Sequence, residues 1–202
     1  PASVKASFPT RFWLFLIGVL LFGLGDFARS FLVYLAAGAL GEKGSLASGT
    51  LSMAVMFYMV HNLVSALAAY PVGHLGDRRA KMPVLIVGYT LGVGTNLLLV
   101  VGSGMLNWLV PAILLSGIYI AIEETLEKAV AAELLPRELR SLGLGYLACV
   151  NAVGDMVSSL YVGFLLQAGR PSLAFGLAAF FGLGGVLWMV LVTAISRSTM
   201  RV

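Results

Sequence analysis

The sequence predicts an all-α, polytopic membrane protein with six transmembrane helices in a single domain covering residues 1–202. Hydrophobic residues make up 59% of the chain and charged residues 11%, against about 25% charged in an ordinary soluble domain. The mean hydropathy of +0.97 agrees with this bias. A soluble fold of this size would have to wrap its core in polar residues, so the apolar surplus indicates a surface in contact with lipid.

Six apolar runs are each long enough to cross a bilayer, which takes about 20 residues. The predicted helices cover residues 12–37, 51–72, 84–101, 108–132, 142–167 and 173–195. Turn-forming residues separate them, at Gly41–Ser45, Gly73–Pro83, Gly102–Gly104, Leu135–Arg137 and Gly169–Pro171. The runs are too long for the strands of a membrane barrel, and no linker or soluble domain interrupts them.

Basic residues are divided unequally between the two ends of the predicted helices, and Lys and Arg accumulate on the cytoplasmic side of membranes. One side carries Lys5, Arg11, Arg78, Arg79, Lys81, Arg137, Arg140, Arg197 and Arg201, and the other carries Lys43 and Arg170. We therefore expect both termini in the cytosol. The basic excess is small and follows the topology, so it does not indicate nucleic acid binding. Because the chain begins at Pro1 rather than Met, we expect a processed chain or a fragment.

Ionisable residues inside four of the predicted helices need a reason, because a charge at mid-bilayer costs about 3 kcal/mol. They are Asp26 and Arg29 in the first helix, His61 in the second, Glu123, Glu124, Glu127 and Lys128 in the fourth, and Asp155 in the fifth. The predicted third and sixth helices carry no charge. We expect the four charged helices to line a substrate or proton pathway, with Asp26, Arg29, His61, Glu123, Glu124 and Asp155 as its residues.

Some of these charges have a purely structural alternative. Asp26 and Arg29 are three residues apart and Glu124 and Lys128 four, so each pair could form an ion pair on one helix. Glu127 and Lys128 lie nearer the cytosol and could extend their side chains to the membrane surface. Glu123 has no such local partner, which favours a functional role for it.

The neutral polar residues and the glycines have mainly structural explanations. His61 could be a hydrogen-bonded packing residue, and we expect Asn62, Asn96 and Asn151 to form hydrogen bonds between helices. The glycine pairs resemble nucleotide-binding loops only superficially, because no strand precedes them. The single Cys149 excludes an internal disulfide and a cysteine-rich metal site. We expect no cofactor, no metal and no enzyme activity.

The segment after the predicted second helix carries a recognisable motif. It reads Pro71-Val-Gly73-His-Leu75-Gly76-Asp77-Arg78-Arg79-Ala80-Lys81. It resembles the Gly-x-Leu-Ala-Asp-Arg-x-Gly-Arg-Lys signature of the major facilitator superfamily, which follows the second helix of each six-helix half. Gly76 replaces the usual Ala and Ala80 the second Gly. The resemblance implies a cytosolic gating loop that contains Gly73, Asp77, Arg78 and Lys81, in which Asp77 pairs with charges across the interface between the halves.

Two further stretches resemble the C-terminal half of that family. Residues Glu123–Gly145 include Pro136-Arg-Glu-Leu-Arg140, which is similar to the fourth helix and following loop of bacterial permeases. Phe22-Gly-Leu-Gly25-Asp26 is similar to the family's seventh helix. Together the motifs imply a C-terminal six-helix half built from two three-helix repeats.

The resemblance implies a secondary transporter that moves a small solute by alternating access, with proton-coupled efflux as one form. Its carboxylates would bind and release a proton, because burial disfavours the charged form of a carboxyl group. The expected partners are the lipid bilayer, the solute, and an N-terminal six-helix half or a second copy, in a bacterial inner membrane. The alternatives are a channel or pore-forming subunit, an intramembrane enzyme, and a non-transporting sensor or scaffold with the same fold.

Overall fold

The computed structural model describes residues 7–39 and 48–199, and these residues form helices and no strand. The α-helices in chain order are α1 (Thr10–Gly23), α2 (Ser30–Ala39), α3 (Ser48–Arg78), α4 (Lys81–Gly102), α5 (Leu106–Leu134), α6 (Arg140–Gln167) and α7 (Pro171–Thr199), and a 3₁₀ turn, Arg137–Leu139, precedes α6. Helices α3 to α7 are each long and apolar enough to cross a membrane, and α1 and α2 are shorter apolar helices. The predicted all-α polytopic fold is confirmed.

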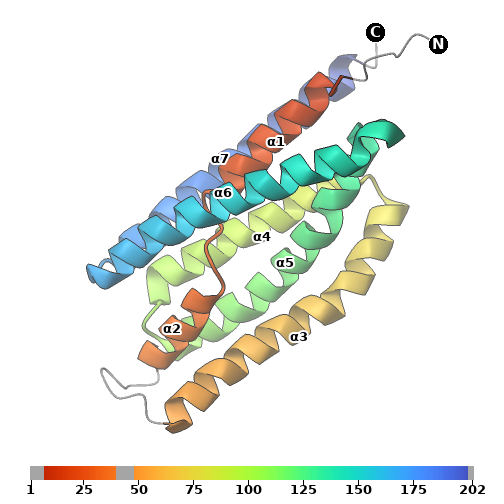
Figure 1. Cartoon of the computed structure of the whole chain (residues 1–202). Coiled ribbons are helices and arrows are strands. Elements are labelled where there is room, and N and C mark those ends of the chain that lie inside the picture. The colour runs from red at the N-terminus through yellow and green to blue at the C-terminus, as the bar shows by residue number, and fades with distance from the viewer. Residues whose placement is uncertain (1–6, 40–47, 200–202) are drawn as a thin grey trace, which may run out of the picture.

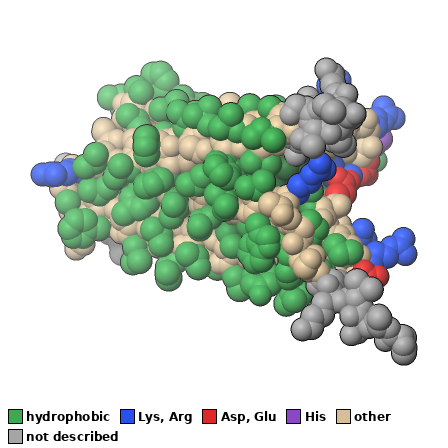
Figure 2. Space-filling view, turned by 90° about the horizontal axis from the view of Figure 1, so that it is seen from above, with side chains coloured by type: hydrophobic (Ala, Val, Ile, Leu, Met, Phe, Trp, Pro, Cys, Tyr) green, Lys and Arg blue, Asp and Glu red, His purple; other side chains and the backbone are tan. Residues whose placement is uncertain are grey.

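The long helices lie lengthwise beside one another and alternate in direction (Figure 1). Helices α1 and α2 follow each other along the length that a single long helix takes elsewhere in the bundle. Figure 2 shows hydrophobic side chains along the visible face, with most of the charged side chains gathered near one end. Of the residues used to predict topology, Lys5, Lys43 and Arg201 lie outside the described residues, as does the predicted turn Gly41–Ser45.

Two apolar clusters hold the bundle together, one around each short helix. The cluster around α1 joins α1 to α4, α5 and α7, and includes Phe12, Phe15, Phe22, Tyr89, Leu126 and Met189. The cluster around α2 joins α2 to α3, α4, α5, α6 and α7, and includes Leu32, Ala54, Leu99, Ile113, Val162 and Phe175. The junction between α1 and α2 therefore lies between two apolar cores, and the polar residues described below gather there.

Helices α3 and α6 are the least enclosed. In the most apolar window of each helix, 11% of the residues of α3 and 17% of those of α6 are buried, against 50% for α4 and 56% for α5. Both pack against α5, and in Figure 1 they stand on opposite sides of it. They expose large apolar side chains such as Met59, Leu67, Leu160 and Phe164. These two helices form the edges of a wall whose centre is α5.

The end of α3 differs from the prediction. The helix continues to Arg78, so the predicted turn Gly73–Pro83 shrinks to Arg79 and Ala80, and Pro83 lies in the first turn of α4, where proline is tolerated. The glycines that suggested a turn serve packing instead: a Cβ on Gly76 would lie 2.6 Å from Leu126 Cδ2. The predicted breaks near Gly102, Pro136 and Gly169 are confirmed, and Gly169 has a φ of 70°.

Candidate functional site

The segment Leu24–Arg29 interrupts the first predicted helix, and its freed backbone groups are bonded by side chains from α4 and α6. The bonds are Tyr161 Oη to Leu24 O (2.8 Å), Asn96 Nδ2 to Gly25 O (3.0 Å), Ser158 Oγ to Asp26 O (2.5 Å) and Ala28 N to Ser159 Oγ (2.9 Å). An unbonded backbone group inside a bilayer costs several kcal/mol, so these contacts stabilise the break. The prediction of one continuous helix over residues 12–37 is wrong. The side chains that stabilise the break are at least 71 residues away in sequence, so no local pattern indicates it.

Glycines allow the break to lie directly against α6 and α7. A Cβ on Gly25 would contact Ala178 O and come within 2.8 Å of Gly182 N. A Cβ on Gly154 would lie 2.9 Å from Gly23 Cα. These neighbours are backbone atoms that cannot move aside cheaply, so both positions require glycine. The break is therefore held against α6 on one side and α7 on the other.

The two charges of the break bind partners on α5 rather than each other. Tyr119 Oη donates to Asp26 Oδ1 at 2.8 Å. Arg29 Nη2 donates to Glu124 Oε1 at 2.5 Å, in an ion pair that is partly exposed. The alternative pairings, Asp26 with Arg29 and Glu124 with Lys128, are therefore not formed: the first would require both residues to be on one helix, and the guanidinium of Arg29 takes up Glu124.

Glu127 is enclosed at the side of α5 that faces α4 and α6. Tyr89 Oη donates to its Oε1, and Asn151 Nδ2 donates to its Oε2 at 2.7 Å. The side chain is 2% exposed, so the expectation that it extends to the membrane surface is wrong. The next residue, Lys128, is exposed. The helix turns these two neighbours to opposite environments, and only Glu127 reaches the donors.

Glu123 lies one turn before Glu127 on α5 but does not receive a hydrogen bond on each oxygen as Glu127 does. Its side chain is 8% exposed, and its buried Oε2 has no hydrogen-bond partner among the described residues. The charged groups that act on it most strongly are Asp26, Glu127 and Asp155. An unpaired polar atom buried in an apolar bundle is costly, so this carboxyl group needs either a proton or a partner that the chain itself does not supply.

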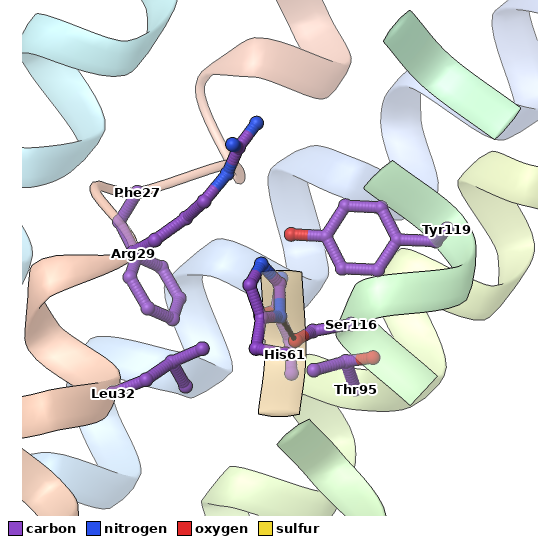
Figure 3. A pocket seen from close by; sticks show the side chains of 8 residues that line it. Phe27, Arg29, Leu32, His61, Thr95, Ser116 and Tyr119 are labelled. Atoms are coloured by element: carbon purple, nitrogen blue, oxygen red, sulfur yellow. Dashed lines mark hydrogen bonds between the residues drawn. The ribbon is translucent and has the colours of Figure 1, made fainter. Parts of the chain in front are cut away.

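His61 occupies the opposite wall of the site, on α3. Its Nδ1 lies 2.7 Å from Ser116 Oγ on α5, and it borders a small cavity with Arg29 and Tyr119 (Figure 3). The site thus draws on the α1–α2 junction, α3 and α5. Asp155, on α6, is exposed, and no described residue donates to its carboxylate.

Two of the three asparagines form the expected bonds between segments, and the third does not. Asn96 and Asn151 bond across helices as predicted, to Gly25 and Glu127. Asn62 donates to Tyr58 O within α3 instead, at 2.8 Å.

A broken helix between two apolar cores, with five carboxyl groups and an arginine beside it, is suited to moving a solute or an ion through a membrane. A family model described as the Major Facilitator Superfamily matches residues 14–200. The chain belongs to the Major Facilitator Superfamily. It is a membrane transporter of that superfamily, whose members are transporters rather than enzymes. No curated protein matches the chain individually.

The superfamily motif lies at the end of the bundle where α3 meets α4. Lys81 Nζ lies 2.6 Å from Glu133 Oε1 on α5 and 3.8 Å from Asp77 Oδ1. The hydrogen bond with Glu133 raises the pKa of Lys81 above its usual value. Asp77 remains 77% exposed in its side chain, so it is free to meet a further partner. This motif is therefore tied to α5 through Lys81, a contact that the sequence did not predict.

Three tyrosines of the site were missed in the sequence. Tyr119 holds Asp26, Tyr89 holds Glu127 and Tyr161 holds the backbone of Leu24. A signal was present: a buried tyrosine hydroxyl usually needs a partner, and these tyrosines stand inside apolar helices. In a membrane superfamily transporter, such residues mark polar contacts as clearly as charges do.

Proposed function

We propose that this chain forms one wall of the solute path in a proton-coupled transporter, and that Glu123 is the residue that binds and releases the proton. The observation that carries the proposal is the buried Oε2 of Glu123, which has no hydrogen-bond partner in the described part of the chain. A carboxylate enclosed in a low-dielectric site favours its protonated form, and hydration of the site favours the charged form. A change in water access during alternating access would therefore switch Glu123.

The other candidate carboxyl groups are less suited to this role. Glu127 is held by two donors and Asp26 by one. Glu124 already has a cation, Arg29, and that partly exposed ion pair is suited to contacting the polar part of a solute. Asp155 is exposed on α6 and would contribute to the same surface.

The exposed charges at mid-membrane support a covering partner. Glu124 and Asp155 would each cost about 3 kcal/mol if they faced lipid. We propose that an N-terminal six-helix half covers the wall between α3 and α6, with the motif end of the bundle and both termini in the cytosol of a bacterial cell. Native mass spectrometry of the purified transporter tests this. One copy of this sequence per particle supports the proposal, whereas two copies indicate a homodimer.

The exposed Asp77 supports a cytosolic latch to that second half. Placed against the N-terminus of a helix in that second half, the carboxylate of Asp77 would be stabilised by the positive end of that helix dipole. Asp77→Asn should shift the transporter toward its inward-open state, measured as longer distances between cytosolic spin labels on the two halves. Unchanged distances would contradict the latch.

Proton coupling is tested in proteoliposomes that enclose a pH-sensitive dye. A panel of sugars, amino acids, organic cations and organic anions is added outside, and proton movement that depends on a solute identifies a coupled substrate. We expect saturable movement in the wild type. In Glu123→Gln, proton movement should fall by about 100-fold, while exchange of labelled solute across the membrane is retained.

Two matched variants serve as controls. Glu133→Gln, at the cytosolic end of the same helix, should keep proton coupling. Glu124→Gln should keep it too, but should need a different solute concentration for half-maximal movement. Normal coupling in Glu123→Gln would refute the assignment, and solute flux that never saturates would indicate a channel.

A further inference from the structure

Another buried titratable group of the site is His61, and its hydrogen-bond partners favour a hydrogen on one ring nitrogen, Nδ1. His61 is 1% exposed. Ser116 Oγ lies 2.9 Å from Ile113 O and donates its one hydrogen there. Ser116 therefore accepts from His61, at 2.7 Å, so Nδ1 carries the hydrogen. The other nitrogen, Nε2, is left as an acceptor.

Nε2 is buried and has no partner among the described residues, and it faces a cavity. In Figure 3 the free side of the imidazole points into the space between Arg29 and the hydroxyl of Tyr119. The cavity has a volume of about 10 Å³ and is also lined by Thr95 and Asn96. Such a volume accommodates about one water molecule.

We propose that this cavity is a binding site for one water molecule, which donates to His61 Nε2 and to Tyr119 Oη and so joins His61 to Asp26. These two bonds use both hydrogens of the water, and its oxygen remains an acceptor. Asn96, which also lines the cavity, donates one amide hydrogen to Gly25 O and has a second one. The site provides the two to four polar partners that a buried water requires.

The chain of groups links Asp26 at the break to His61 on α3, and a proton can move along it in either direction. A proton on Nε2 moves to the water oxygen, the water gives a hydrogen to Tyr119 Oη, and Tyr119 gives its hydrogen to the Asp26 carboxylate. An imidazolium and a carboxylate become an imidazole and a carboxylic acid, and the water and the hydroxyl are restored. The role of this relay in transport rests on the proposed function, but its existence does not.

The surroundings of His61 carry little net charge. Arg29 from the break and Glu124 from α5 are the charged groups that act on His61, and they neutralise each other at 2.5 Å. From its own helix His61 faces Tyr58, with ring centroids 6.3 Å apart. From α2 and the break it faces Leu32 and Phe27, and from α4 the neutral Thr95 and Asn96. Tyr119, which lines the cavity, joins it to Asp26 by a hydrogen bond, whereas the hydroxyl that binds Glu127 belongs to Tyr89, which does not line the cavity.

Water is the probe in the first experiment, solid-state NMR of the full transporter in lipid with ¹⁵N-labelled histidine. Loss of a signal in His61→Gln assigns His61, and loss in His74→Gln assigns His74, which is exposed on the same helix. We expect the hydrogen of His61 on Nδ1, and magnetisation transfer from water to Nε2 within about tenfold of the transfer to His74. A hydrogen on Nε2, or no transfer from water, would overturn the proposal.

The second experiment measures how fast His61 Nε2 gains and loses a proton, from the exchange broadening of its ¹⁵N signal as the pH is lowered. Because His61 is buried, the relay is its route to water. Tyr119→Phe removes the linking hydroxyl and should slow exchange by about 100-fold. Tyr89→Phe removes the equivalent tyrosine–carboxylate bond at Glu127 and should leave the rate unchanged. Equal rates in Tyr119→Phe and wild type would refute the relay, and the wild-type water transfer remains decisive if Tyr119→Phe does not fold. Neither experiment depends on proton-coupled transport.

Discussion

Glu123 and Glu127 are the same residue type one turn apart on the same helix, and both are buried, yet the bundle treats them oppositely. Glu127 receives a hydrogen bond on each oxygen, from Tyr89 and Asn151. Glu123 has a buried oxygen with no hydrogen-bond partner within residues 7–39 and 48–199. The difference indicates that burial alone does not identify a functional carboxyl group in a membrane helix. What distinguishes Glu123 is that the fold leaves its hydrogen bonding incomplete.

The most direct test of this difference makes the same substitution at both positions. We expect the larger loss of stability at Glu127. Glu127→Met keeps a similar volume but leaves the hydroxyl of Tyr89, which is 0% exposed, without an acceptor. The expected loss of stability is about 2 kcal/mol. Thermal unfolding in detergent measures it, and an unchanged unfolding temperature would mean that the two hydrogen bonds do not hold Glu127.

The next effect concerns the packing that positions Tyr89. Phe22 stacks on Tyr89 with ring centroids 3.8 Å apart, and a Cβ on Gly185 of α7 would lie 2.7 Å from Phe22 N. Gly185→Ala should therefore destabilise the protein by about 1 to 2 kcal/mol, because backbone must move. Gly184→Ala is the matched control, since nothing lies within 4 Å of its Cβ, and it should be neutral or slightly stabilising. Equal effects in the two variants would show that the end of α1 is not closely packed against α7.

Glu123→Met completes the pair of substitutions at Glu123 and Glu127. Replacing a buried, unpaired carboxyl group with an apolar side chain of similar size is neutral or stabilising, here by up to about 1 kcal/mol. The unfolding temperature should stay the same or rise, while proton-coupled transport is lost. A clear loss of stability would mean that Glu123 has a structural partner after all.

The smallest effect concerns the ion pair between Lys81, at the start of α4, and Glu133, at the end of α5. The bond raises the pKa of Lys81 above 10.5, so its stabilisation is complete below about pH 10.5 and is lost as pH rises through the folded pKa. Glu133→Gln should reduce stability by about 0.5 kcal/mol near neutral pH. The difference from wild type should vanish in strongly alkaline buffer, and a difference that persists there would exclude the ion pair as its cause.

The membrane fold could be predicted from the sequence because hydropathy and helix length are local properties. The break was missed for the same reason. Gly23 and Gly25 look no different in sequence from Gly182 and Gly184, which stay helical in α7. What separates them is a set of distant side chains, such as Asn96 and Ser158, that replace the lost backbone bonds.

The residues of the site were predicted better than their pairing. Asp26, Arg29, Glu124 and His61 do gather in space, as their cost in a bilayer suggested. Spacing along one helix gave the wrong partners, because Arg29 reaches Glu124 across 95 residues once the helix is broken. Pairing depends on how helices rotate against one another, and no local pattern encodes that rotation.

The central claim is that Glu123 binds the transported proton, and infrared difference spectroscopy of the carboxyl C=O stretch after a pH jump tests it most directly. The measurement needs no solute and compares the wild type with Glu123→Gln and Glu124→Gln in lipid. We predict a protonated-carboxyl band that is present in the wild type and in Glu124→Gln, and absent in Glu123→Gln. A band that survives unchanged in Glu123→Gln would contradict the account, because another carboxyl group would then carry the proton.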